Sequence, residues 1–260
     1  MGDLYLFGTV HTDPDGAFRL GSALEFVSPD KIFIEISEDR THALFANTLE
    51  DKMREHEENI ASWEEQGFTL TPDQRTRLLE IARFKNKDYG YELTAPTNYQ
   101  TVHPQTEIHY VDLAAKSAEF TNGLREAFNM PSPQLTETQK RNILAGLEHS
   151  VEAHQRSFRI LAEREYGESM DSAVYMRMMA ENPELLEKET RHLTPEAREA
   201  FYHVVSPERN NAIAQGIRDG HNAKVVSAGV MGAFHLYIVA GLLEDLKPNV
   251  ILLNQIPVPQ

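Results

Sequence analysis

Two histidines stand three residues after a glycine, and each follows a strand-like segment of the chain. Gly8-Thr-Val-His11 follows the apolar run at residues 4–7, and Gly232-Ala-Phe-His235 follows the segment at residues 224–228. Glycine permits a sharp backbone turn, so each imidazole can point back over the end of the preceding strand. A neutral imidazole there can accept a proton or bind a divalent metal ion. Either histidine taken alone is also explained as a hydrogen-bonded loop residue.

Glu35 interrupts an otherwise apolar segment, Ile32-Phe-Ile-Glu-Ile36. An ionised carboxylate inside a sheet costs on the order of several kcal/mol unless a cation, a metal ion or hydrogen-bond donors neutralise it. The functional interpretation is a carboxylate of an active or metal site, since strongly perturbed acids cluster at such sites. The structural interpretation is a buried salt bridge to Arg40 or Arg209.

The elements that must position these side chains are strands and helices at the two ends of the chain. Residues 4–7 and 31–36 indicate buried strands joined through a helix at 17–27, and such a βαβ connection makes the two strands parallel. Further elements are expected as strands at 108–111, 224–228 and 250–253, a turn at 229–232 and a helix at 236–246. Ligand sites of open α/β sheets form beyond the carboxyl ends of the strands. We therefore expect four side chains to gather at one edge: His11, Glu35, Asp112 and His235.

The middle of the chain is typical of helices. Capping boxes at Thr71–Gln74 and Thr136–Gln139, and prolines at Pro195 and Pro207, mark helix starts. The predicted fold class is α/β: a mixed, largely parallel sheet formed by the N- and C-terminal parts of a single domain, residues 1–260, with a long helical insertion or lid at about 117–220. Apolar stripes in this insertion also predict a homo-oligomer formed through it.

The composition excludes several classes of protein. The 260 residues include no cysteine, and 40 acidic against 25 basic side chains give a net charge of -15. Disulfides, thiolate metal sites and a cysteine nucleophile are excluded, so a metal ion would be bound by His or oxygen ligands. The acidic excess disfavours nucleic acid and anionic membranes as partners. The N-terminus lacks a basic region of the signal-peptide kind, which predicts a cytoplasmic protein, and residues 225–243 are read as a strand, a turn and a buried helix rather than a membrane span.

The segment Asp13-Pro-Asp-Gly16 is similar to the start of a calcium-binding EF-hand loop. Counting from Asp13, however, the twelfth position is Leu24, where such a loop needs a bidentate Glu. We therefore expect a turn, with Asp13 as a minor candidate ligand.

The order of these elements resembles the TraB/PrgY/TIKI family, within a broader group that includes erythromycin esterase and the haem-binding protein ChaN. The family opens with Gly-Thr-x-His and continues, after a Pro-Asp turn, with a strand that carries Glu-Leu-Asp-x-x-Arg. It then has a Gly-x-Glu element, a strand ending in Asp-Arg, a helix opening with Glu-Arg-(Asp/Asn), and Gly-Ala-Gly-His. The matches here are Gly8–His11, Glu35-Ile-Ser-Glu-Asp-Arg40, Gly90-Tyr-Glu92, Val111-Asp112-Leu113, Glu208-Arg-Asn210 and Gly232–His235.

The chain departs from this pattern at three positions. Ser37 replaces the family's Asp, Leu113 its Arg, and Phe234 its second motif glycine. The bulky Phe234 could narrow the pocket beside His235. The family's acid is absent at Ser37 and its base is absent at Leu113. The two differences are either a paired change or a sign that the activity has been lost.

The resemblance implies an EreA/ChaN-like fold and a metal-dependent hydrolase of peptidase type. His11, Glu35 and His235 would bind a divalent ion, with Mn²⁺ or Co²⁺ favoured and Zn²⁺ as a further option, and a water on that ion would attack an amide carbonyl. Glu92 is expected as general base or further ligand, and Arg209 as the group that stabilises the oxyanion or orients Glu35. The substrate would be a peptide or a small molecule.

Two other functions fit the same resemblance. One is a metal-independent esterase of the erythromycin-esterase type, in which His and Glu activate water to open an ester or lactone. The other is a protein without enzymatic activity that binds haem or a peptide, with Tyr or His side chains as haem ligands.

Overall fold

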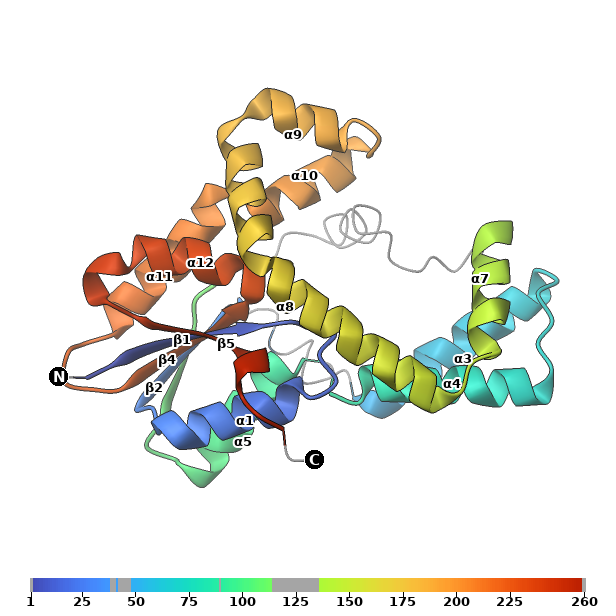
Figure 1. Cartoon of the computed structure of the whole chain (residues 1–260), viewed down its shortest axis with the longest axis horizontal. Helices are drawn as coiled ribbons and strands as arrows, with labels where there is room; N and C mark the ends of the chain where they lie inside the picture. The colour runs from blue at the N-terminus through green and yellow to red at the C-terminus, as the bar shows by residue number, and fades with distance from the viewer. Residues whose placement is uncertain (1, 38–40, 42–47, 89, 114–135, 259–260) are drawn as a thin grey trace.

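Five parallel strands form one sheet in the order β3-β2-β4-β1-β5 (Figure 1). The computed structural model describes residues 2–37, 41, 48–88, 90–113 and 136–258. The strands are β1 Leu4–Thr9, β2 Lys31–Ile34, β3 Glu107–Tyr110, β4 Ser227–Gly232 and β5 Asn249–Leu252. The two ends of the chain therefore build the sheet together, as predicted, and every pairing among the described strands is parallel.

Helices cover both faces of this sheet. On one face α1 (Gly16–Val27) and α5 (Tyr91–Val102) pack over a cluster that contains Phe7, Ile32 and Ile34. On the other face α11 (Pro207–Gly220) and α12 (Ala233–Leu242) pack over Leu4, Leu6 and Phe33. A strand buried on both faces is a continuous apolar run, which explains why residues 32–34 show no polar alternation.

The remaining helices extend away from the sheet. The long helix α8 (Val151–Glu181) crosses from the sheet to a separate apolar cluster that α3 (Leu49–Glu65), α4 (Pro72–Asn86) and α7 (Glu137–Leu147) form around Trp63 (Figure 1). Helices α9 (Pro183–Thr190) and α10 (Pro195–Val205) follow its other end. Between β3 and β4, residues 137–220 are thus mainly helical. The start of the predicted insertion, residues 117–135, lies outside the described residues.

The local signals at helix starts are confirmed. Thr71 and Thr136 each accept a hydrogen bond in a complete capping box, and Pro195 and Pro207 stand at the first turn of their helices. These caps satisfy backbone N–H groups that have no partner inside the helix.

The predicted turn at residues 229–232 is wrong, because these residues belong to strand β4. A Cβ atom at Gly229 would lie 2.8 Å from Leu6 Cδ2, so this glycine serves close packing inside the sheet rather than a turn. Helix α12 begins directly after the strand, at Ala233, and a short 3₁₀ turn, Glu244–Leu246, follows its end. Within the described part of the chain, no helix combines the length and the apolar character that a bilayer crossing requires.

Candidate functional site

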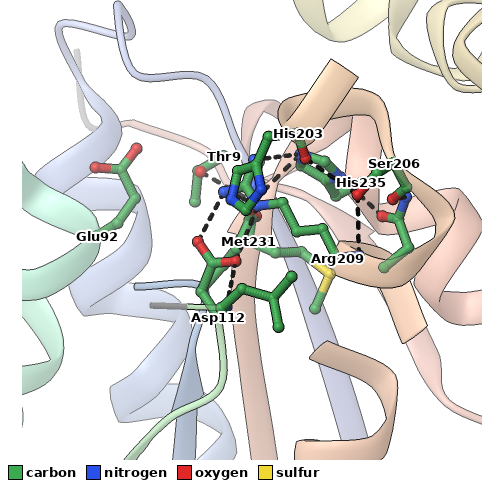
Figure 2. A network of polar contacts seen from close by, with 12 residues as sticks. Thr9, Glu92, Asp112, His203, Ser206, Arg209, Met231 and His235 are labelled. Atoms are coloured by element: carbon green, nitrogen blue, oxygen red, sulfur yellow. Dashed lines mark hydrogen bonds and ion pairs between the residues drawn. The ribbon is translucent and has the colours of Figure 1, made fainter. Parts of the chain in front are cut away.

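The carboxyl ends of four neighbouring strands bring the predicted side chains together. His11 follows β1 by two residues, Glu35 directly follows β2, Asp112 follows β3 by two residues, and His235 lies in the first turn of α12 after β4. Figure 2 shows Asp112, Arg209 and His235 close together at this edge, with Glu92 apart from them. The parallel order of the strands produces this convergence.

Arg209 lies at the centre of the buried part of the site. Its Nη2 atom is 2.8 Å from Glu35 Oε1 and 2.9 Å from Asp112 Oδ2, and its Nε atom is 2.9 Å from Asp112 Oδ1. The start of α11 positions the side chain, because Ser206 Oγ accepts a hydrogen bond from the Arg209 amide. The guanidinium thus binds Asp112 through two parallel hydrogen bonds and Glu35 through an ion pair.

Glu35 is held by a backbone group as well as by Arg209. Its Oε2 atom accepts a hydrogen bond from the Gly232 amide at 2.7 Å, at the junction of β4 and α12. Burial raises the pKa of Glu35, Arg209 opposes that shift, and Asp112 adds to it. The predicted ion pair with Arg209 is present, while Arg40, the other predicted partner, lies outside the described residues.

His235 has a defined tautomer. Its Nδ1 atom is 2.8 Å from Asn210 Oδ1, and the Asn210 amide nitrogen donates to the Ser206 carbonyl, which fixes the orientation of that amide. The proton therefore sits on Nδ1 and the lone pair on Nε2, which is 3.3 Å from Arg209 Nη1 and 3.3 Å from Glu35 Oε1. Burial, together with the nearby Arg209 cation, holds the pKa of His235 well below 6.5.

His11 forms a second, more open group with Glu92. Its Nδ1 atom lies 2.6 Å from Glu92 Oε1, and 72% of the His11 side chain is exposed against 9% for Glu92. The Glu92 carboxylate raises the pKa of His11 to about 9, although water screens part of this attraction at an exposed ring. Burial acts to raise the pKa of Glu92, but the His11 charge and hydrogen bond outweigh it and lower that pKa.

A cavity of about 250 Å³ opens beside His11. Its walls come from the end of β1, from one side of α8 and from the β4–α12 junction, where Phe234 stacks at a tilt against His235. Its lining residues are Thr9, Val10, His11, Glu165, Glu168, Ser169, Ser172, Gly232, Ala233 and Phe234. Glu35 reaches the edge of this cavity through Gly232, whose amide binds it.

The predicted metal ligands are only partly brought together. Glu35 Oε1 and His235 Nε2 are 3.3 Å apart, which suits two donors to one ion with bonds of about 2.1 Å. Arg209, however, contacts both atoms, and His11 Nδ1 faces Glu92. Within the described ranges, no three His, Asp or Glu side chains form a group that could hold a metal ion. An ion at Glu35 and His235 would have to displace the guanidinium.

The roles of two residues at the site were not predicted from the sequence, although Asn210 belongs to the quoted Glu208-Arg-Asn210 motif. Asn210 sets the His235 tautomer, and Tyr166 of α8 hydrogen bonds to the loop that carries His11. Ser37, one of the departures from the family pattern, is buried, and its Oγ atom has no hydrogen-bond partner in the described part of the structure.

In comparisons with known proteins, no family model, curated protein or solved structure matches the chain.

Proposed function

We propose that this protein is a hydrolase that opens an ester or lactone, with His11 as the group that exchanges a proton with the attacking water. The observation that carries the proposal is the 2.6 Å contact between His11 Nδ1 and Glu92 Oε1 on the wall of the cavity. A carboxylate at Nδ1 orients the ring and leaves Nε2 for the reacting water, which is the arrangement of an oriented general base. The EreA/ChaN-like identity of the fold is part of this proposal.

Glu35, Arg209 and Asp112 support this role indirectly, through the bond between Glu35 and the Gly232 amide of the cavity wall. Arg209 uses Nε and Nη2 on the two carboxylates, so it fits the role of orienting Glu35 better than that of binding an oxyanion. Glu35 in turn holds the Gly232 amide, which belongs to the cavity wall. We therefore assign Arg209 and Glu35 to the shape and charge of the site, and His11 and Glu92 to proton transfer.

The test is ester hydrolysis by the chelator-treated protein and its His11→Asn variant, measured with a panel of p-nitrophenyl esters and lactones. General-base catalysis contributes about 10²–10⁴-fold, so we expect kcat/KM to fall by that factor. The control is His192→Asn, because His192 is exposed between α9 and α10 and distant along the chain from every residue of the cavity wall. Equal hydrolysis by wild type and His11→Asn would refute the proposal.

A second candidate is a metal-dependent amide hydrolase with His11, Glu35 and His235 as ligands. The 3.3 Å separation of Glu35 Oε1 and His235 Nε2 favours it, and Asn210 would fix the His235 ring from its other nitrogen. A bound Mn²⁺, Co²⁺ or Zn²⁺ ion would lower the pKa of a coordinated water.

This second candidate is tested by metal binding rather than by activity. Arg209→Gln removes the cation that competes for both ligand atoms, so an ion should bind this variant more tightly than wild type and raise its Tm further. His235→Gln in the Arg209→Gln background removes one ligand and should abolish the gain. Absence of any stoichiometric Mn²⁺, Co²⁺ or Zn²⁺ binding to wild type and to Arg209→Gln would exclude the metal site.

A further inference from the structure

The residue before His11 is held by two buried tyrosines from different helices. The Val10 amide donates to Tyr166 Oη at 3.3 Å, and Tyr91 Oη donates to the Val10 carbonyl at 3.1 Å. Tyr166 belongs to α8 and Tyr91 to α5, and each residue is 1% exposed. Both backbone polar groups of Val10 are thus satisfied by phenol groups from outside the loop.

The residue two positions after His11 is held by the same phenol. Tyr166 Oη donates to Asp13 Oδ2 at 3.0 Å, and Arg19 Nη1 donates to that oxygen at 3.0 Å. The other oxygen of Asp13 accepts from the Asp15 amide at 2.9 Å. Both oxygens of Asp13 therefore accept hydrogen bonds within the protein. The side chain stabilises the predicted turn and is not a free metal ligand.

Tyr166 also links this loop to the cavity wall. It lies on α8 between Glu165 and Ser169, which both line the cavity, and Ser169 Oγ donates to its carbonyl at 2.7 Å. Thr12, next to His11, donates to Glu165 Oε2 at 3.3 Å. One turn of α8 therefore contacts the loop on both sides of His11.

We propose that Tyr166 is a positioning residue that keeps His11 against Glu92 and beside the cavity, a role that rests on the proposed hydrolase function. Its hydroxyl accepts from Val10 and donates to Asp13, so phenylalanine would remove both bonds in one step. A buried Val10 N–H and a buried Asp13 oxygen would each lose a partner, and loops relax to restore such bonds. That relaxation moves the backbone on both sides of His11 and weakens its contact with Glu92.

The test is Tyr166→Phe, with Tyr175→Phe as the matched control, because Tyr175 lies on the same helix and is 43% exposed. The first readout is the pKa of the His11 imidazole by NMR, assigned from the signal that His11→Asn loses. We expect Tyr166→Phe to lower this pKa from about 9 toward 6.5, with no change in Tyr175→Phe. The second readout is ester hydrolysis, where misplacement of a reacting group predicts a kcat loss of about tenfold to a hundredfold at nearly constant KM.

An unchanged His11 pKa in folded Tyr166→Phe would overturn the proposal and leave Tyr166 as an ordinary core residue. The NMR readout needs no substrate, so it separates this result from a failure of the hydrolase proposal, which a wild-type protein inactive on every ester would show. If Tyr166→Phe does not fold, Tyr91→Phe removes the hydroxyl that donates to the Val10 carbonyl and should shift the His11 pKa in the same direction. An unchanged His11 pKa in folded Tyr91→Phe would then overturn the proposal.

Discussion

His11 and Glu92 lie 2.6 Å apart at Nδ1 and Oε1, although 81 residues separate them in the chain. Glu92 directly follows Tyr91 at the start of α5, so two adjacent residues hold the imidazole of His11 and the carbonyl of Val10. A shift of α5 would therefore move the backbone contact and the side-chain contact together. This relationship makes α5 part of the candidate site, although the helix packs mainly against α1.

Replacing Glu92 by Gln should shift the titration of His11 to lower pH. Glu92 is the largest cause of the raised pKa of His11, about 9, so its loss should bring the value back toward 6.5. A general base acts in its neutral form, so the pH profile of kcat/KM should rise through about pH 9 in wild type and at lower pH in Glu92→Gln. NMR titration and the pH profile check both values.

The control is Glu25→Gln, which removes the carboxylate 3.4 Å from His103 on the surface. It should leave the pH profile of kcat/KM unchanged.

The contact between His11 and Glu92 should also contribute to the free energy of unfolding. A group whose pKa is raised in the folded state stabilises fully below pH 6.5, and it loses that contribution as the pH rises through about 9. Urea unfolding at pH 6 and pH 9.5 should therefore differ more in wild type than in Glu92→Gln.

Replacing Arg209 by Gln should destabilise the protein strongly at neutral pH. Glu35 and Asp112 would remain buried without their cation, and breaking a buried ion pair costs about 3–5 kcal/mol. The matched control is Arg218→Gln, whose partner Asp245 is exposed, and such a surface pair contributes about 1 kcal/mol or less. Urea unfolding at pH 7 measures both. Similar losses from the two variants would mean that Arg209 does not neutralise the two carboxylates.

Acid should partly rescue Arg209→Gln. Burial already raises the pKa of Glu35, and loss of Arg209 removes the charge that opposes this shift. Protonation of Glu35 then removes one uncompensated charge, so the stability gap between Arg209→Gln and wild type should narrow as the pH falls from 7 to 5. A gap that stays constant over this range would contradict the assignment.

The sequence predicted that strand ends would bring His11, Glu35, Asp112 and His235 to one edge of the sheet, because apolar runs joined through a helix indicate parallel strands. Glu35 illustrates this: an acid in an apolar strand requires a neutralising group, and Arg209 is that group. The support of the loop around His11 could not be predicted in the same way, since Tyr166, which hydrogen bonds to Val10 and Asp13, is one of several aromatic residues in α8. Side-chain contacts between helices depend on how those helices pack, and a single sequence carries no local signal for such contacts.

The same limit explains the misplaced turn at residues 229–232. Glycine is read as a turn residue because it adopts unusual backbone angles, yet Gly229 and Gly232 lie in a regular buried strand. Gly229 is required because the Leu6 side chain leaves no room for a Cβ atom at this position. This contact follows from the pairing of β1 with β4, which the local sequence does not indicate.

Replacing Asn210 by Asp should raise the pKa of His235. The Asn210 oxygen now faces Nδ1 at 2.8 Å as a neutral acceptor, and a carboxylate in its place would favour the imidazolium form. Burial and Arg209 hold the wild-type pKa well below 6.5, so the change should appear as a His235 signal that titrates at higher pH by NMR. Asn98→Asp, on an exposed position of α5, is the control. An unaltered His235 titration would contradict the contact between residue 210 and His235 Nδ1.

Gly16 and Gly21 should respond in opposite directions to alanine, although both lie in α1. A Cβ atom at Gly16 would overlap the Tyr91 ring and lie 2.7 Å from Tyr91 Oη, whereas nothing lies within 4 Å of one at Gly21. Overpacking of this kind costs about 1–3 kcal/mol, while Gly→Ala in an unstrained helix position stabilises by about 0.4–1 kcal/mol. Urea unfolding should therefore rank Gly21→Ala above wild type and Gly16→Ala below it. A displaced Tyr91 would release the Val10 carbonyl, so Gly16→Ala, unlike Gly21→Ala, should also lower the His11 pKa. Equal NMR titrations of His11 in the two variants would show that the packing of α1 does not affect the site.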